Sequence, residues 1–560
     1  MISYQNIGNF YKVIFTGKTL QEFHEFFRLT KDFKKSTIPI ITDTGQPVVA
    51  WKIKKEDLDS IINDFSNPVE IINEYENIGG NMKLSPYLYQ KEAIHFGLQK
   101  KNALIILPCG SGKSPVGIGL CVEAYKQKII SGKCLIVVKA SLKYQWLKEV
   151  EKFSHLKAKI VETPSKIGKK NFSKQFEDCD VFILNYETLK NKDVVEHLLT
   201  KNIELIYSDE IHYVNNHESS RSKALYQFNY VKIKIGATAT PITNNPGNLF
   251  GIFNFINPDL FLTWSNFRNN YLRYTGYGRP PKSKNEEHLK TQIAPYMLIK
   301  TKEEIADQLP STVINKQYIQ MTNTMASMNE KIMNELDDAN KQAQAYEEKM
   351  TPKELENSEE FNSIKARVMA LQTFAQELVD SPKLLKESES DMAKQYYINE
   401  ESTKLNACLE LIETILEAEE KVCIFSKFER MQSILEDAIK KRFKNIDIAK
   451  INGAMDPKER YEEAYTKFRD TESYKILLGT DAMAEGVNLS RCKYLIEYDL
   501  ANSYAIQTQR HGRLERADSI HSTVYVYQLI MEKSWDEIAA KIIDKKEGYD
   551  NNIIKDLKNM

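Results

Sequence analysis

The stretch ALIILPCGSGKS, residues 103–114, decides the fold of this chain. Its first residues are apolar, as in a buried strand, and the helix-like residues 115–128 follow directly after it. Gly110 and Gly112 allow the loop to curl, so that successive backbone N–H groups point toward phosphate oxygens. The start of the following helix adds a partial positive charge. The stretch therefore predicts a strand, a phosphate-binding loop and a helix.

The side chains at this loop suit a magnesium nucleotide. Lys113 can reach the β- and γ-phosphates, and the Ser114 hydroxyl can bind Mg²⁺. A second apolar strand, ELIYSDE, ends in Asp209 and Glu210, where a parallel sheet presents its ligand-binding edge. Asp209 suits the Mg²⁺ shell, and Glu210 suits the polarisation of an attacking water. The loop departs from the general P-loop pattern at Leu107, which stands in place of the first glycine.

Outward from this loop, apolar strands alternate with helical segments in two separate series. Such alternation is typical of a parallel sheet wrapped by helices. The fold class is therefore predicted to be α/β, with two parallel-sheet lobes. The strands are expected at 103–108, 134–138, 181–187, 204–210 and 232–239 in the first series, and at 421–426, 446–453, 474–481, 494–500 and 523–530 in the second.

We expect several parts along the chain, because 560 residues exceed what one core holds. From 322 to 400 the sequence is polar and poor in glycine, which predicts long helices. These helices are a solvated spacer or bind a protein partner, and the sequence leaves both open. The expected parts are a small accessory α/β domain (1–80), an ATP-binding lobe (81–262), a helical insertion and linker (263–400), a second lobe (401–530) and a C-terminal helical brace (531–560).

The composition argues against several classes of protein. Lys plus Arg and Asp plus Glu both number 77, so nucleic acid would have to be held by a local groove rather than by bulk attraction. The seven cysteines are scattered without a C-x-x-C pair, which argues against zinc sites and disulfides and for a reducing compartment. No apolar run approaches the roughly 20 residues of a membrane helix, and no signal-peptide pattern opens the sequence. We expect a cytoplasmic monomer without a membrane partner, associated with the nucleoid or nucleus if cellular and in the host cytoplasm if viral.

Five motifs, in order, resemble motifs I, II, III, V and VI of superfamily 2 helicases. They are PCGSGKS (108–114), DEIH (209–212), ATATP (237–241), TDAMAEGVNL (480–489) and QRHGRLER (509–516). The resemblance spans roughly residues 84–545. It implies a nucleic-acid-stimulated ATPase whose two lobes are RecA-like and close over ATP and Mg²⁺.

Further stretches resemble the sucrose-nonfermenting class of DNA translocases, which includes chromatin remodellers and annealing helicases. They are LSPYLYQKEAIHF (84–96), LIVVKASLKYQWLKEV (135–150), DEIHYVNNHESSRSKAL (209–225), PYMLIKTKEEIADQLP (295–310), STKLNACLELI (402–412), KVCIFSKFERM (421–431) and INGAMDPKER (451–460). The chain departs from the class at Lys139, where proline is usual, and at Ile299 and Lys300, which replace an Arg pair. DEIH in place of DEAH, AMAEG in motif V, and Ala517-Asp518 in place of Gly-Gln leave the subfamily open.

The resemblance implies roles for residues around the nucleotide. An arginine supplied from outside the P-loop lobe is worth roughly 10³–10⁵ in rate in other P-loop enzymes. If residues 509–516 are helical, Arg513 and Arg516 share one face and both point at the γ-phosphate across a cleft. The implied catalytic residues are Lys113, Asp209, Glu210, Arg513 and Arg516; the nucleotide contacts are Gln90 (on the base), Gly110, Ser111, Gly112, Lys113, Ser114, Gly486 and Gln509; the metal ligands are Ser114 and Asp209; and the coupling residues are His212, Thr238 and Thr240.

Alternating grip on a phosphate backbone would turn closure of the cleft into movement along a strand. Such contacts are independent of base sequence and sensitive to salt. We expect DNA, double-stranded or branched, as the partner. The candidate contacts are Lys139, Ser141, Asn185 and Tyr186 in lobe one and Ser426, Lys427, Asn452, Gly453 and Thr480 in lobe two.

Residues 10–66 resemble, over a short stretch, the HepA-related (HARP) domain of annealing helicases. The likeness rests on a helix before Phe33, a strand that carries Trp51 and the turn into DLDSIINDF. It implies recognition of DNA structure at forks or branches; otherwise this part only stabilises lobe one. Strands are expected at 11–17 and 46–53 and helices at 20–33 and 57–65.

Three functions remain open at this point. The first is a DNA-stimulated ATPase that translocates on duplex DNA and remodels forks, branches or bound proteins. The second is a helicase that separates strands of DNA or RNA. The third is a nucleotide-gated binding module that docks on a polymerase or nuclease.

Overall fold

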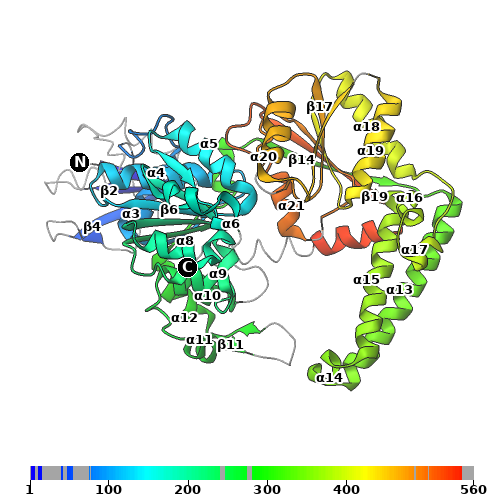
Figure 1. Ribbon diagram of the computed structural model, residues 1–560, viewed down its shortest axis with the longest axis horizontal. Coiled ribbons are helices and arrows are strands. Elements are labelled where there is room, and N and C mark those ends of the chain that lie inside the picture. The colour runs from blue at the N-terminus through cyan, green and yellow to red at the C-terminus, as the bar shows by residue number, and fades with distance from the viewer. Residues whose placement is uncertain are drawn as a thin grey trace.

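The two lobes are two separate parallel sheets, one in each half of the chain (Figure 1). The computed structural model describes residues 75, 77–239, 246–273, 281–444, 446–484, 487–501 and 503–544, together with the backbone of the strands at 2–6, 10–15, 40–41 and 47–54.

Lobe one is a seven-stranded parallel sheet with helices on both faces. Its strands are β5 (Asn102–Ile106), β6 (Lys133–Val138), β7 (Ala158–Ile160), β8 (Val181–Asn185), β9 (Ile203–Asp209), β10 (Ile233–Thr238) and β13 (Met297–Ile299), in the order β13-β5-β10-β9-β6-β8-β7. One face carries α3 (Leu88–Lys100), α4 (Lys113–Lys126) and α5 (Lys143–Phe153), and the other α8 (Lys192–Leu199), α9 (Ser220–Tyr226) and α10 (Asn248–Ile256). Leu104 and Ile106 of β5 face the second set of helices, whereas Ala103 and Ile105 face the first. Because both faces are covered, the strands are continuous apolar runs.

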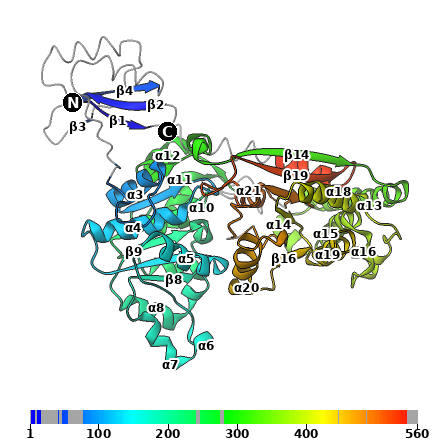
Figure 2. The ribbon, with the colours of Figure 1, turned by 90° about the horizontal axis from the view of Figure 1, so that it is seen from above.

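Lobe two is a six-stranded sheet in which every neighbouring pair is parallel. Its strands are β14 (Ser311–Ile319), β15 (Val422–Phe425), β16 (Asp447–Ile451), β17 (Tyr474–Gly479), β18 (Tyr494–Glu497) and β19 (Thr523–Met531), in the order β14-β19-β18-β15-β17-β16. Its helices include α18 (Thr403–Glu417), α19 (Glu429–Arg442), α20 (Pro457–Tyr461) and α21 (Tyr504–His511). Both α20 and α21 lie on the side of lobe two that faces lobe one (Figures 1 and 2).

The segment 263–400, predicted to be helical, also supplies a strand to each sheet. β13 pairs with β5 in lobe one, and β14 pairs with β19 along nine residues in lobe two. β13 is only three residues long and β14 is a half-exposed edge strand, so neither shows the apolar run that marks the other strands. We call residues 300–310 the connector, because they join the edge of one sheet to the edge of the other.

The rest of this segment forms the predicted long helices. α13 (Asn323–Lys349) and α15 (Glu359–Asp380) pack against each other as a hairpin, with the short α14 (Pro352–Glu356) at its tip. The hairpin, called the arm below, projects away from the sheet of lobe two (Figure 1).

The accessory part contributes a small antiparallel sheet. Its strands β1 (Ile2–Asn6), β2 (Phe10–Phe15), β3 (Ile40–Ile41) and β4 (Pro47–Lys54) have the order β1-β2-β4-β3, and β2 and β4 match the two expected strands. The helices expected at 20–33 and 57–65 lie outside the described residues. Of the expected C-terminal brace, residues 531–544 are described, and 535–544 of these are helical. Within the described ranges, no helix combines the length and the apolar character needed to cross a bilayer.

A fully buried ion triad ties the arm to lobe two. Nζ of Lys404, on α18, lies 2.7 Å from Oδ1 of Asp380 and 2.8 Å from Oδ2 of Asp536. Nε2 of Gln376 donates to both carboxylates, and the Tyr498 hydroxyl donates to the backbone carbonyl of Asp380. Since Asp380 ends α15, these bonds join the base of the arm, the sheet of lobe two and the C-terminal helix.

We expect Lys404→Met to destabilise lobe two by about 3–5 kcal/mol, because it leaves two carboxylates buried without their cation. The measurement is urea unfolding followed by circular dichroism. The matched control is Lys341→Met, which removes an exposed ion pair with Asp337 on the arm and should leave the unfolding midpoint unchanged. Equal midpoints for the two variants would contradict the structural role given to the triad.

Candidate active site

The P-loop between β5 and α4 uses glycine where no side chain fits. Gly110 and Gly112 both have a φ of +77°. A Cβ at Gly112 would lie 2.5 Å from Nε2 of Gln90, and a Cβ at Gly110 would overlap the backbone oxygen of Glu515. The loop therefore curls tightly into the N-terminus of α4, which begins at Lys113. This is the strand-loop-helix geometry of a phosphate cradle.

Gln90 and its neighbour hold the P-loop from α3. Nε2 of Gln90 donates to the carbonyl of Ser111 at 2.9 Å, and the Tyr89 hydroxyl donates to the same oxygen at 2.5 Å. Oε1 of Gln90 accepts from the N–H of Tyr87 at 2.9 Å and so caps α3. Gln90 thus shapes the loop, and its contact with a nucleotide base stays a prediction.

The first acid, Asp209, lies buried at the end of β9. Its Oδ2 accepts from Nε1 of Trp146 at 3.2 Å, and its backbone carbonyl accepts from the Tyr186 hydroxyl at 2.8 Å. Burial, followed by the neighbouring carboxylate of Glu210, raises the pKa of Asp209 to about 6. A nearby cation would favour the charged form of this carboxylate.

The second acid, Glu210, is surrounded by donors. Nζ of Lys113 lies 3.9 Å from its Oε1, Nδ1 of His212 lies 3.3 Å from its Oε2, and the Thr238 hydroxyl lies 3.3 Å from the same Oε2. Burial alone would raise the pKa of Glu210, but Lys113 and His212 lower it below its usual range. His212 also lies 3.1 Å from the Thr238 hydroxyl, so one polar network joins the P-loop, β9 and β10. The third predicted coupling residue, Thr240, lies outside the described residues.

Lobe two brings Arg513 and Arg516 to the same cavity, but not on a helix. α21 ends at His511, so the prediction that the two arginines share a helical face is wrong. Gly512 follows the helix, and glycine has a low helix propensity. A side chain at this position would also be too close to the P-loop, because a Cβ would lie 2.5 Å from that of Cys109. The arginines therefore lie in a turn after α21, which we call the finger loop (residues 512–519).

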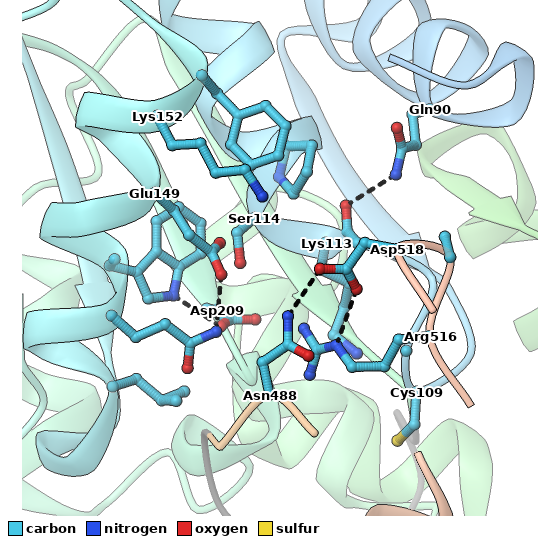
Figure 3. A pocket seen from close by; sticks show the side chains of 18 of the residues that line it. Gln90, Cys109, Lys113, Ser114, Glu149, Lys152, Asp209, Asn488, Arg516 and Asp518 are labelled. Carbon is cyan, nitrogen blue, oxygen red and sulfur yellow. Dashed lines mark hydrogen bonds and ion pairs between the residues drawn. The ribbon is translucent and has the colours of Figure 1, made fainter. Parts of the chain in front are cut away.

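A cavity of about 390 Å³ lies between the lobes and brings these residues together (Figure 3). Its volume is within the range of small-molecule sites. Of the predicted nucleotide-site residues, it is lined by Gln90, Gly110, Gly112, Lys113, Ser114, Asp209 and Glu210 from lobe one and by Gln509, Arg513 and Arg516 from lobe two. Ser111 belongs to the loop, but its side chain is fully buried, and Gly486 lies outside the described residues.

The cavity also has lining residues that were not named as site residues from the sequence, although Glu149 and Asn488 lie within stretches quoted there. Glu149 and Lys152 reach it from α5, and Asn488 and Asp518 reach it from lobe two (Figure 3). Nδ2 of Asn488 donates to Asp518 at 2.8 Å, and Oδ1 of Asp518 lies 3.7 Å from Nε of Arg516. Glu149 and Lys152 are three residues apart, a spacing that places both side chains on one face of a helix. This spacing was the sequence feature from which their shared position at the cavity could have been predicted.

Four of the predicted nucleic-acid contacts have buried side chains: Asn185, Tyr186, Ser426 and Thr480. Tyr186 bonds the active-site backbone as described above, and the Ser426 hydroxyl donates to Asp499 at 2.9 Å. Small polar groups at strand ends often satisfy buried loop groups in this way. Contact of these four side chains with phosphate stays a prediction.

The other five candidates are partly or fully exposed. Nζ of Lys139 lies 4.9 Å from the centre of the Tyr213 ring, and Lys139 also lines the cavity. Contact of this group with nucleic acid stays a prediction. The group consists of Lys139, Ser141, Lys427, Asn452 and Gly453.

Comparison with known proteins agrees with this geometry. The family model of the SNF2-related domain matches residues 47–384, and that of the helicase conserved C-terminal domain matches residues 403–518. An uncharacterized ATP-dependent helicase of Mycoplasma pneumoniae is 24% identical over 84% of this chain and 42% of its own length. The uncharacterized ATP-dependent helicase YqhH of Bacillus subtilis is 24% identical over 87% of this chain and 83% of its own length. The ISWI chromatin-remodeling complex ATPase ISW1 of Saccharomyces cerevisiae is 24% identical over 85% of this chain and 41% of its own length.

The chain thus spans less than half the length of two of these three relatives. A solved structure, the Sulfolobus solfataricus SWI2/SNF2 ATPase core in complex with dsDNA, is 24% identical, with 85% of this chain and 96% of that chain covered and a TM-score of 0.38. The SNF2-related match alone covers more than half of the 560 residues, and a helicase C-terminal domain follows it. The chain therefore belongs to the SNF2-related family and is an ATP-using enzyme of the superfamily 2 helicase type.

Proposed function

We propose that this chain is an ATP-dependent translocase that moves on double-stranded DNA and thereby remodels forks, branches or DNA-bound proteins. The observation that carries the proposal is the cavity lined by Lys113, Asp209 and Glu210 from one lobe and by Arg513 and Arg516 from the other. A triphosphate in this cavity would touch both lobes, so its cleavage would change how the lobes are held together. One of the relatives reported above supports this, since ISW1 of Saccharomyces cerevisiae is named a chromatin-remodeling complex ATPase.

The residues of lobe one fit a magnesium nucleotide as substrate. The P-loop backbone and Lys113 would hold the phosphates, and Ser114 and Asp209 offer the hydroxyl and carboxylate oxygens that Mg²⁺ prefers. In the described part of the chain, no cluster of three or more His, Cys, Asp or Glu could hold a metal by itself. This suits an ion that also uses phosphate oxygens and water. When bound, Mg²⁺ neutralises charge on the phosphates.

Glu210 would orient the attacking water. Lys113 and His212 keep its carboxylate charged, and a charged carboxylate can accept a hydrogen bond from water. Arg513 and Arg516 would stabilise the charge that develops on the transferred phosphoryl group. Their effect would be large if closure over the nucleotide excludes bulk water from the cavity.

Movement requires that each lobe also hold the DNA. The candidates with exposed surface for phosphate are Lys139 in lobe one and Lys427, Asn452 and Gly453 in lobe two, whereas the Ser141 hydroxyl is buried in this arrangement. Because the net charge of the chain is zero, a few local contacts must supply the affinity. A strand-separating helicase would use the same ATP chemistry and differ in which strands it grips.

We expect Glu210→Gln to lower kcat by at least about 10³-fold while the Kd for ATP stays within a few fold, because the amide keeps the volume but cannot orient the water as a charged base. A coupled ATPase assay and a fluorescent-nucleotide titration measure the two quantities. Glu151→Gln, an exposed glutamate on α5, serves as the control. Loss of ATP binding in Glu210→Gln would argue for a structural role instead.

For Arg513→Ala, we expect a fall in kcat of about 10³-fold or more with little change in nucleotide affinity. The reason is that the guanidinium acts on charge that appears during cleavage. Arg491→Ala, which removes an arginine from the exposed surface of lobe two, should leave kcat unchanged. A near-normal rate for Arg513→Ala would refute the assignment.

The nature of the partner is tested by ATPase rates with single-stranded DNA, blunt duplex DNA, forked DNA and RNA. We expect blunt duplex and forked DNA to stimulate turnover, and the affinity to fall steeply as salt rises from about 50 to 200 mM. Stimulation by single strands but not by blunt duplex would favour a strand-separating helicase. Turnover that no nucleic acid changes would favour a nucleotide-gated binding module.

A further inference from the structure

We infer that Glu515 is a positioning residue, which fixes the finger loop to the connector between the lobes and so sets the place of both arginines. The inference rests on the proposed role of Arg513 and Arg516 in ATP cleavage. Glu515 lies between them in sequence but is absent from the described residues that line the cavity. Its effect on the reaction would therefore act through the arginines.

The side chain of Glu515 bonds the segment that joins the two sheets. Its Oε2 lies 2.7 Å from Nζ of Lys302 on the connector, and its Oε1 accepts from the hydroxyl of Thr312, at the start of β14, at 2.5 Å. The Glu515 side chain is only 8% exposed, whereas Lys302 is 51% exposed, so the carboxylate end of the pair is shielded from water and the ammonium end is not. Burial would raise the pKa of Glu515, but Lys302 and His511 lower it, which keeps the carboxylate charged.

The backbone of the same loop touches lobe one. The N–H of Ala517 donates to the carbonyl of Gly110 at 3.3 Å, and the Tyr87 hydroxyl donates to the carbonyl of Ala517 at 2.8 Å. The backbone oxygen of Glu515 also fills the space beside Gly110. The finger loop is therefore held on two sides, by the P-loop through its backbone and by the connector through Glu515.

The connector is itself fixed to lobe one just before Lys302. Nζ of Lys300 lies 2.6 Å from Oε2 of Glu92 on α3, and the N–H of Lys300 donates to the carbonyl of Ile106 at the end of β5. Two lysines, two residues apart, thus hold the connector to opposite lobes. A change in the angle between the lobes would shift the connector and, through Glu515, the two arginines.

The test uses Glu515→Gln, Lys302→Met and the double variant in the full chain. We expect each single change to lower kcat about 10–100-fold, because a small misplacement of a catalytic group has costs of this size. KM for ATP and the Kd for ADP should stay within about twofold. Affinity for ADP–aluminium fluoride, which mimics the transferred phosphoryl group, should fall by about the same factor as kcat. The double variant should be no worse than the more severe single variant, because the two residues act as one pair.

The control is Lys316→Met, which removes an ion pair between β14 and Asp544 and should leave kcat unchanged. Wild-type kcat in Glu515→Gln or Lys302→Met would overturn the inference. A fall in kcat accompanied by an equal loss of affinity for ADP would also overturn it. A fall in kcat in a variant whose Tm lies below that of Lys316→Met would do the same, because either outcome indicates a purely structural role. Arg513→Ala, measured in parallel, separates the two proposals. A normal kcat in Arg513→Ala would refute the arginine assignment. A lowered kcat in Arg513→Ala together with a normal kcat in Glu515→Gln would refute only the role of Glu515.

Discussion

The contact between the P-loop and the finger loop is the constraint on which the rest of the site depends. Gly110 has no side chain, so the backbone of lobe two can lie directly against the backbone of lobe one. This close approach brings both arginines to the cavity that also contains Lys113 and Glu210. A bulkier residue at the glycine would separate the lobes at the place where the proposed nucleotide would join them.

A few buried ionic groups have structural roles in this molecule, although most of its ion pairs are exposed. Its formal net charge is zero, and the fully buried ionic groups described above lie in lobe two and at the base of the arm. Arg510 illustrates this: it is fully buried and bonds Asp481 and the backbone of Asp499, so it holds the framework of lobe two. Arg513, three residues later, lies at the cavity instead. One short motif thus divides its arginines between holding the fold and reaching the site.

Much of the fold was predictable because its strands are buried on both faces. Runs such as those of β5, β6 and β17 contain only apolar residues at the buried positions, and their predicted bounds differ from the observed ones by a residue or two. β13 and β14 were missed because one is very short and the other is an exposed edge. Both depend on pairing with strands far away in the chain, which local patterns do not report.

The same limit applies to the site. The residues proposed to face the phosphates were predicted from the loop and the strand-end acids, and in the structure they line one cavity. The end of α21 at His511, the burial of Tyr186 and the presence of Asn488 at the cavity depend on packing between segments distant in sequence. A motif specifies the residue type at a position, but it does not specify how segments distant in sequence pack around that position.

The buried triad of Lys404, Asp380 and Asp536 has a mechanical consequence for the arm. Because α15 is fastened at its base to lobe two, the hairpin cannot swing independently there and must turn with that lobe. α13 has 27 residues, which at the rise of an α-helix makes it about 40 Å long. A lobe rotation of about 10° would then carry the tip through roughly 7 Å, so the arm acts as a lever that amplifies a small angular step.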